Sequence, residues 1–284
     1  MTFFDRFSAA LPGDDAQSLQ LLFFDVPEWS AEALQSILRR VPGLEGANVE
    51  LQAVQGIAQT NAHGPPASEL GLVTWGRHAV KIEVCHAPMP YGPVEACVGP
   101  ALMPPPMKVD AKQHKAHALL YSAGEERDPL ECFVALCAVA GAMARFDAIA
   151  VLNEEARTAA PALDLIPDDG EDALATYRAL PIPYLLGGFV KMDTGEAERP
   201  WVRTFANHRL GLPNLARQLD GHGQTAETFQ LFAGMLGYLR TMGETFEAGD
   251  VVDLGNGPKL SLRTPRDDEW WLDSAGSMLV VESA

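Results

Sequence analysis

The stretch that decides the fold runs from Val80 to Tyr121 and reads VKIEVCHAPMPYGPVEACVGPALMPPPMKVDAKQHKAHALLY. Its first five residues alternate between apolar and charged side chains, as the residues of a half-buried strand do. A run rich in proline and glycine follows, and His114-Lys115-Ala116-His117 then leads into a second apolar strand. The sequence therefore predicts two core strands joined by a proline-stiffened crossing.

Neighbouring segments predict hairpins on both sides of this stretch. Turn residues separate short runs of strand-forming residues in each of them. The predicted hairpins are Leu72–Trp75 with His78–Val84, Tyr184–Lys191 with Trp201–Phe205, and Asp250–Leu254 with Lys259–Leu262. A final apolar strand is expected over Ser277–Val281.

Helices fall in blocks between these strands. Ser30 is a suitable N-cap for one helix, and Asp128 followed by Pro129 is a strong start for another, which is apolar almost all round and is therefore expected to be buried. A further helix is predicted from Thr225 to Gly243, and a short one from Pro213. Hairpins outnumber crossovers, so we expect an α+β fold with largely antiparallel sheets and helices packed on one face.

The expected organisation has three parts. Residues 1–155 form an N-terminal α+β half around the buried helix, and residues 181–284 form a C-terminal α+β half. Between them, residues 156–180 carry Pro161, Pro167 and the run Asp168–Asp172, which is typical of an acidic loop or junction. The alternative of one compact domain stays open.

Composition restricts the kinds of partner. The 284 residues hold 21 Lys and Arg against 38 Asp and Glu, a formal charge of −17. So acidic a surface repels nucleic acid and anionic membrane and favours a basic protein partner. No run of apolar residues is long enough for a membrane span, and no secretion signal or cofactor motif is recognised. Four cysteines without a CxxC pair indicate reduced thiols, and hence the cytoplasm.

Several short segments together resemble a known bacterial family. They are His86-Ala87-Pro88-Met89-Pro90, His114-Lys115-Ala116-His117, Arg203-Thr204-Phe205, Gly211-Leu212-Pro213-Asn214-Leu215, and Thr241-Met242-Gly243 with Gly249-Asp250-Val251-Val252. Their order is similar to that of the family called domain of unknown function 4261, and the likeness covers roughly residues 18–265. The resemblance implies a bacterial cytoplasmic accessory or immunity-type protein from type VI secretion or polymorphic-toxin loci, without a defined activity.

An enzymatic alternative rests on His86, His114 and His117. Three imidazoles and a water would suit a hydrolytic zinc ion. However, His114 and His117 are three residues apart, which places them on opposite faces if both lie in a strand. The chain also lacks HExxH and GxSxG, so no catalytic residue is assigned and a metal site remains the alternative to a non-enzymatic protein.

Acidic clusters beside aromatic residues are the candidate partner-binding site. Acids around an exposed aromatic anchor suit a basic protein surface. The candidate contacts are Asp267, Asp268, Glu269, Trp270, Trp271 and Trp201. These features predict a binding protein, of the immunity or accessory kind, that masks a basic toxin or effector. A structural subunit of an assembly is a further alternative, and the oligomeric state is left open.

Overall fold

The computed structural model describes residues 3–9, 16–54, 65–168, 170–192, 194–195, 198–253, 255 and 259–284. Within them the chain forms seven α-helices and thirteen strands, and the strands pair mostly antiparallel. The predicted α+β class is therefore confirmed. The chain divides into two compact units, each with its own sheet: unit 1 is Met1–Glu154 with Ala159–Leu180, and unit 2 is Glu155–Thr158 with Pro181–Ala284.

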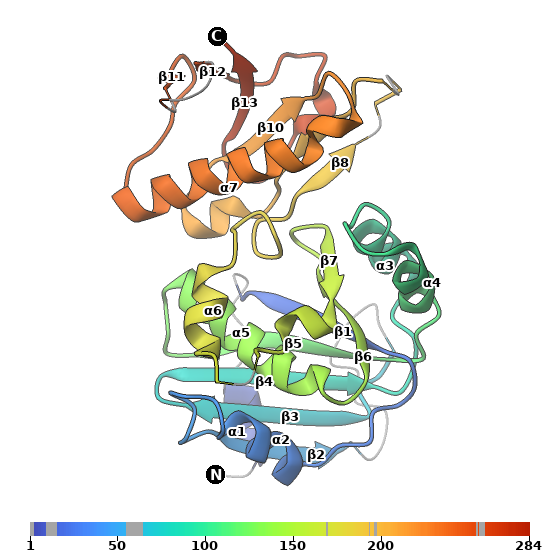
Figure 1. Ribbon diagram of the computed structural model, residues 1–284. Coiled ribbons are helices and arrows are strands. Elements are labelled where there is room, and N and C mark those ends of the chain that lie inside the picture. The colour runs from blue at the N-terminus through green and yellow to red at the C-terminus, as the bar shows by residue number, and fades with distance from the viewer. Residues whose placement is uncertain are drawn as a thin grey trace. The chain divides into compact units, whose positions relative to one another are not determined.

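A seven-stranded sheet runs through unit 1 (Figure 1). In spatial order its strands are β2 (Asn48–Ala53), β3 (Glu69–Trp75), β4 (His78–Cys85), β5 (Ala116–Gly124), β1 (Ser18–Phe23), β6 (Ala148–Asn153) and β7 (Thr158–Pro161). All pairings from β2 to β6 are antiparallel. The first predicted hairpin is present as β3 and β4.

The two strands predicted from Val80–Tyr121 are β4 and β5, which pair side by side with Val80 opposite Ser122. The proline-stiffened crossing between them holds two short helices that were not predicted, α3 (Tyr91–Val98) and α4 (Pro105–Lys112). Pro90 and Pro104 are their N-caps. The fixed φ of proline suits the start of a helix, so these prolines begin helices here and do not prevent them.

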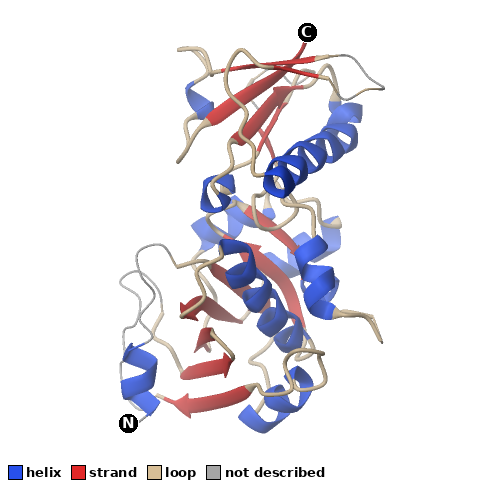
Figure 2. Ribbon diagram, turned by 90° about the vertical axis from the view of Figure 1, so that its left-hand side faces the viewer, coloured by secondary structure: helices blue, strands red, loops and turns tan. Residues whose placement is uncertain are grey.

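Helix α5 (Pro129–Ala144) is the central helix of unit 1 (Figures 1 and 2). Asp128 accepts a hydrogen bond from the amide of Leu130 (2.8 Å), as its N-cap position predicts. Every residue from Phe133 to Ala144 is buried, and the helix contacts β1, β4, β5 and β6. The shorter helices α1 (Phe3–Ala9) and α2 (Ala31–Leu38) also belong to unit 1, and Ser30 caps α2 as predicted.

Most of the segment expected as an acidic loop, Ala159–Leu180, is folded into unit 1, whereas residues 156–158 belong to unit 2. It contains β7, the 3-10 helix η1 (Ala162–Leu165) and helix α6 (Ala173–Ala179). Asp172 is the N-cap of α6 and accepts a hydrogen bond from the amide of Ala175 (3.1 Å). The helices and apolar runs of this segment are too short for helical periodicity to be recognised in the sequence. Its composition therefore suggested a loop.

A six-stranded sheet forms unit 2. Its spatial order is β11 (Val251–Val252), β12 (Leu260–Arg263), β13 (Met278–Ser283), β10 (Asn214–Gln218), β9 (Trp201–Arg203) and β8 (Val190–Met192). The hairpin predicted from Tyr184 to Phe205 is shorter than expected, because residues 182–186 form turns and only β8 pairs with β9. The hairpin predicted from Asp250 to Leu262 is present as β11 with β12. The last strand, β13, lies inside the sheet, antiparallel to β12 and parallel to β10.

Helix α7 (Thr225–Met242) covers this sheet, and Gly243 ends it in the left-handed region (φ 65°). Its apolar stripe, which includes Phe232 and Leu236, packs with residues of the sheet such as Leu215 and Leu279. The short helix predicted from Pro213 is wrong, because this segment is β10. Pairing with the distant strand β13 outweighs the local helix signal.

Short 3-10 helices complete unit 2, namely η2 (Asn207–Leu210), η3 (His222–Gln224) and η4 (Trp270–Leu272). In the part of the chain that the structure describes, no helix has the length and apolarity needed to cross a bilayer.

Candidate functional site

The three predicted tryptophans meet in unit 2, beside η4. The ring centroids of Trp201 and Trp271 lie 6.1 Å apart, and those of Trp271 and Trp270 lie 5.9 Å apart, both in edge-on geometry. Trp201 is buried, Trp271 is half-buried and Trp270 is 72% exposed. The rings thus form a continuous series from the core to the surface, which we call the tryptophan series (Trp201, Trp271, Trp270).

This arrangement corrects one predicted contact. Trp201 packs with Leu272, Met278 and Val280 in the core of unit 2 and offers no surface to a partner. The ring of Trp201 instead supports Trp271 by packing against its ring on the core side. Trp270 is the member of the series that is available for binding.

Glu269 is likewise not a surface contact, because only 5% of it is exposed. Its carboxylate accepts two hydrogen bonds from the guanidinium of Arg263 (2.7 Å each) and one from the amide of Arg266 (2.8 Å). Burial would raise the pKa of Glu269, but these hydrogen bonds outweigh it and hold the pKa below its usual value. Arg263 also donates to Glu282 (2.7 Å), so the turn before Trp270 is tied to both β12 and β13.

The remaining predicted acids, Asp267 and Asp268, are exposed in the turn that leads to Trp270. From Arg263 to Ser283 the chain carries two arginines and five carboxylates, a formal charge of −3. The exposed indole of Trp270 therefore lies in a locally acidic segment, as the sequence predicted.

Sequence reasoning missed the residue that holds η4 in place, Arg203. The residue is 1% exposed, and its guanidinium donates to the main-chain carbonyls of Trp271 (2.6 Å) and Asp273 (3.1 Å). It also lies over the ring of Phe205, 4.1 Å from the centroid. Burial, together with the charge of Arg157, lowers the pKa of Arg203 to about 10. The sequence contains no local signal for this contact, because the partners lie about seventy residues apart.

The rings of His114 and His117 lie edge to face with their centroids 6.4 Å apart, but each of the three histidines of the alternative metal site has its own partner within the protein. Both ring nitrogens of His114 are engaged: Nδ1 with the carbonyl of Ala111 and Nε2 with the amide of Met89, at 2.7 Å each. The Met89 amide must donate, so His114 is neutral with its proton on Nδ1. Burial lowers the pKa of His114, consistent with the neutral form.

His117 and His86 have separate partners. Nδ1 of His117 contacts the carbonyl of Ala87 (2.7 Å), and burial lowers the pKa of His117. His86 faces Glu69, with its Nε2 3.3 Å from the carboxylate. Among the described residues, no three His, Cys, Asp or Glu side chains are arranged to hold a metal ion. His114 and His117 instead fasten the segment Ala87–Met89 to the start of β5.

In the pairing of β4 with β5, Cys85 lies directly opposite His117, a residue that is distant from it in the sequence. Cys85 is 1% exposed, and burial raises the pKa of its thiol to about 11. A nucleophilic cysteine needs a depressed pKa and access to solvent. Cys85 therefore has the properties of a structural thiol.

A second feature that the sequence did not reveal is the buried amine of Lys81 on β4. Lys81 is 2% exposed, and its Nζ lies over the ring of Phe7, 4.5 Å from the centroid. Burial lowers the pKa of Lys81, while the nearby charge of Glu83 opposes that change. Both side chains belong to the same face of β4, because they are two residues apart on a strand.

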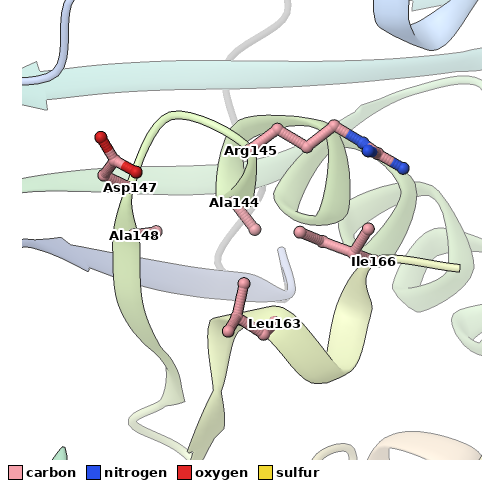
Figure 3. Close-up of a pocket in the computed structure, with 6 residues that line it drawn as sticks. All are labelled: Ala144, Arg145, Asp147, Ala148, Leu163 and Ile166. Atoms are coloured by element: carbon pink, nitrogen blue, oxygen red, sulfur yellow. The ribbon is translucent and has the colours of Figure 1, made fainter.

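Two pockets lie at the C-terminal end of α5 in unit 1. The shallower one has a volume of about 500 Å³ and is lined by Ala144, Arg145, Asp147, Ala148, Leu163 and Ile166 (Figure 3). The side chain of Arg145 extends away from Asp147 in this view. Arg145 also lines the second, more enclosed pocket, of about 210 Å³, which lies between α2, α5 and α6.

Comparison with family models, curated proteins and solved structures finds no match. The likeness to domain of unknown function 4261 therefore stays a prediction from the sequence.

Proposed function

We propose that this chain is a non-enzymatic binding protein that masks a basic protein partner, with Trp270 as the central contact. The observation that carries the proposal is the 72% exposure of Trp270 on a turn that is otherwise firmly held. Exposed tryptophans are costly to leave in water, and they are frequent anchors of protein interfaces.

The rigidity of the turn supports this proposal. Arg263 and Glu269 hold the chain before Trp270, Arg203 holds the carbonyl after it, and Trp271 packs against its ring. A contact residue that is already in place loses little conformational freedom on binding, which favours affinity. Asp267 and Asp268 would then pair with lysines or arginines of the partner and raise the rate of encounter.

The biological setting of the proposal is a bacterial cytoplasm, where the chain would act as an immunity or accessory factor for a basic toxin or effector. All four cysteines are free thiols, which suits a reducing compartment. The type VI secretion or polymorphic-toxin context rests on the sequence resemblance alone.

The test is affinity purification of the tagged full chain from its host, at low and at physiological salt. Wild type is expected to retain one basic protein at near-equal stoichiometry, and Trp270→Ala is expected to weaken binding by about 30-fold or more. The matched control is Tyr91→Ala, which removes another exposed aromatic side chain (69%) from unit 1.

Charge is tested separately with the double variant Asp267→Lys/Asp268→Lys. Its control, Glu28→Lys/Glu125→Lys, changes the net charge equally at two exposed positions of unit 1. Only the first pair should weaken binding and reduce its salt dependence. Retention of the partner by Trp270→Ala at wild-type affinity would refute the proposal.

A further inference from the structure

The segment between β4 and β5, which we call the insert, is held at both of its ends by the buried histidines His114 and His117. At its start, the carbonyl of Ala87 contacts Nδ1 of His117 and the amide of Met89 donates to Nε2 of His114, at 2.7 Å each. At its end, Nδ1 of His114 contacts the carbonyl of Ala111, also at 2.7 Å. The ring of His114 therefore ties the beginning of the insert to the last turn of α4.

The insert covers an apolar part of the sheet of unit 1. Its helices α3 and α4 contact each other and β6 (Figure 1). The thiol of Cys97 on α3 donates to the main-chain carbonyl of Asn153 on β6 (3.7 Å). Around this contact, buried residues of the insert pack with buried residues of the sheet, among them Val94, Val98 and Met103 with Leu22, Ala150 and Leu152. Cys97 is 1% exposed, so its access to solvent reports whether the insert is in place.

His114 can hold the insert only in its neutral form. A main-chain amide donates and does not accept, so Nε2 of His114 must offer its lone pair to Met89. A proton on Nε2 would remove this acceptor and bring two N–H donors face to face. The carbonyl of Ala111 favours the charged ring, but burial outweighs it and lowers the pKa of His114. Burial lowers the pKa of His117 in the same way.

The charged groups around the two rings do not favour a proton on them. In the described part of unit 1, neither ring bonds to a carboxylate. The rings lie edge to face with their centroids 6.4 Å apart, so a charge on His114 disfavours one on His117. On the neighbouring elements several charged side chains have partners of their own, namely His86 with Glu69, Lys108 with the carbonyl of Gly99, Lys112 with Glu95, and Lys115 with Asp25. Three further titratable groups are Asp110 of α4, which is exposed, and Cys85 and Glu83 of β4, on the same face of the sheet as His117.

We propose that His114 and His117 form an acid-sensitive switch, in which protonation releases the insert from β6 while the rest of the sheet stays paired. The eight residue pairs of β4 with β5 lie outside the insert, so they do not require it. A histidine of the released insert titrates near its ordinary pKa of 6.5. If the closed form stays neutral, the open fraction rises by up to about thirtyfold between pH 7.5 and pH 5 for one histidine. The switch lies in unit 1, so it is independent of the proposal for Trp270.

Thiol labelling of the full chain tests the switch. The reagent is 4,4′-dithiodipyridine, which reacts with thiols in acid as well as at neutral pH, and mass spectrometry assigns the modified cysteines. Each rate is divided by that of the urea-unfolded chain at the same pH, which removes the intrinsic pH dependence of the reaction. Cys97 reports on the insert, and Cys137, which is buried in α5, reports on unit 1 as a whole. Between pH 7.5 and pH 5 the relative rate of Cys97 should rise at least about tenfold, while that of Cys137 stays within about twofold.

Variants assign the effect to the histidines. His114→Gln keeps a neutral acceptor for the amide of Met89 but does not titrate, so the rise at Cys97 should shrink to about threefold or less. His117→Gln should reduce the rise by a smaller factor, because the contact of Nδ1 with Ala87 is open to the charged ring as well. The control His222→Asn removes an exposed histidine of unit 2 and should keep the wild-type rise.

Protection of Cys137 shows that each variant is folded. A constant relative rate of Cys97 between pH 7.5 and pH 5 would overturn the proposal. So would a parallel rise at Cys97 and Cys137, because unit 1 would then unfold as a whole. An undiminished rise in folded His114→Gln would place the responsible proton elsewhere and also overturn it. If His114→Gln does not fold, His117→Gln and the comparison of Cys97 with Cys137 in the wild-type chain decide.

Discussion

The buried guanidinium of Arg203 donates a 2.6 Å hydrogen bond to the main-chain carbonyl of Trp271, and this contact joins β9 to the turn that presents Trp270. The same group also donates to the carbonyl of Asp273 (3.1 Å). A side chain of the sheet thereby fixes the backbone on both sides of Leu272. The exposed indole is consequently displayed by the core of unit 2 and not by a loose loop.

Replacing Arg203 with Met should destabilise unit 2 by about 2–4 kcal/mol, because two carbonyls lose their donor inside the protein. The measurement is urea unfolding followed by the fluorescence of the five tryptophans, three of which (Trp201, Trp270 and Trp271) lie in unit 2. Arg199→Met is the control, since Arg199 is 55% exposed and forms only a long ion pair with Asp220 (3.5 Å). Equal stability of Arg203→Met and wild type would show that the contact does not hold the turn.

The tryptophan series predicts opposite effects at its two ends. Trp201→Ala should cost about 3–5 kcal/mol, as expected for a large buried aromatic side chain. Trp270→Ala should change the free energy of unfolding by no more than about 0.5 kcal/mol, because its side chain is mostly in water. Chemical denaturation of both variants measures the difference. A large loss of stability in Trp270→Ala would mean that this residue serves the fold and not a partner.

Gly141→Ala should destabilise unit 1 by about 1–3 kcal/mol, since its new methyl group would overlap the Leu165 carbonyl and the Tyr177 hydroxyl. The matched control is Gly234→Ala in the middle of α7. Nothing lies within 4 Å of a Cβ at Gly234, so alanine should stabilise α7 by up to about 1 kcal/mol. Thermal unfolding of the two variants should therefore shift in opposite directions, and parallel shifts would contradict the packing described.

The buried histidines predict that stability falls in acid. Burial holds the pKa values of His114 and His117 below the ordinary value of 6.5. At a pH between these lowered pKa values and 6.5, the unfolded chain therefore binds more protons than the folded chain. Stability supplied by the neutral histidines is present above about pH 6.5 and is lost as the pH falls below it. Urea midpoints measured between pH 7.5 and pH 5 test this trend.

Two variants assign that pH dependence. His114→Asn should have a shallower loss of stability between pH 7 and pH 5 than wild type, because it no longer titrates. His117→Asn should do the same, because burial lowers the pKa of His117 as well. Identical slopes for wild type and His114→Asn would assign the effect to other groups.

Alkylation should distinguish the four thiols. Cys137 and Cys85 are buried with raised pKa values, and Cys97 is also buried, whereas Cys132 is only half-buried. Under native conditions iodoacetamide should therefore modify Cys132 first, and the other three only after unfolding. Mass spectrometry of timed samples gives the order, and rapid labelling of Cys85 would show that its surroundings are more open than described.

Much of the fold was readable in the sequence because its signals are local. The caps at Ser30 and Asp128, the all-apolar helix α5 and three hairpins follow from neighbouring residues, and the structure contains them. The failures are of two kinds. The prolines between β4 and β5 start helices through their fixed φ, a local signal that was overlooked. Pro213 precedes a strand, because pairing with the distant β13 decided that segment.

The candidate site was predictable only in part. The sequence identified Trp270 and the acids before it as candidate contacts. Whether a residue contacts a partner or supports the fold depends on its exposure to solvent, and that exposure is set by the whole fold. Trp201 and Glu269 look like surface residues in the sequence and are buried in the structure. Arg203 and the enclosed pocket beside α5 arise from contacts between distant segments, for which the sequence has no period or motif.

The position of β13 between β12 and β10 also governs how unit 2 is made on the ribosome. Strand β9 is synthesised 77 positions before β13, which takes roughly 4–15 s at about 5–20 residues per second. Until Met278–Ser283 emerges, β10 lacks its parallel neighbour and β12 lacks its antiparallel one. Before that point the nascent sheet consists of two separate parts with unpaired edge strands. This is the stage at which the chain is most prone to aggregate and most in need of a chaperone.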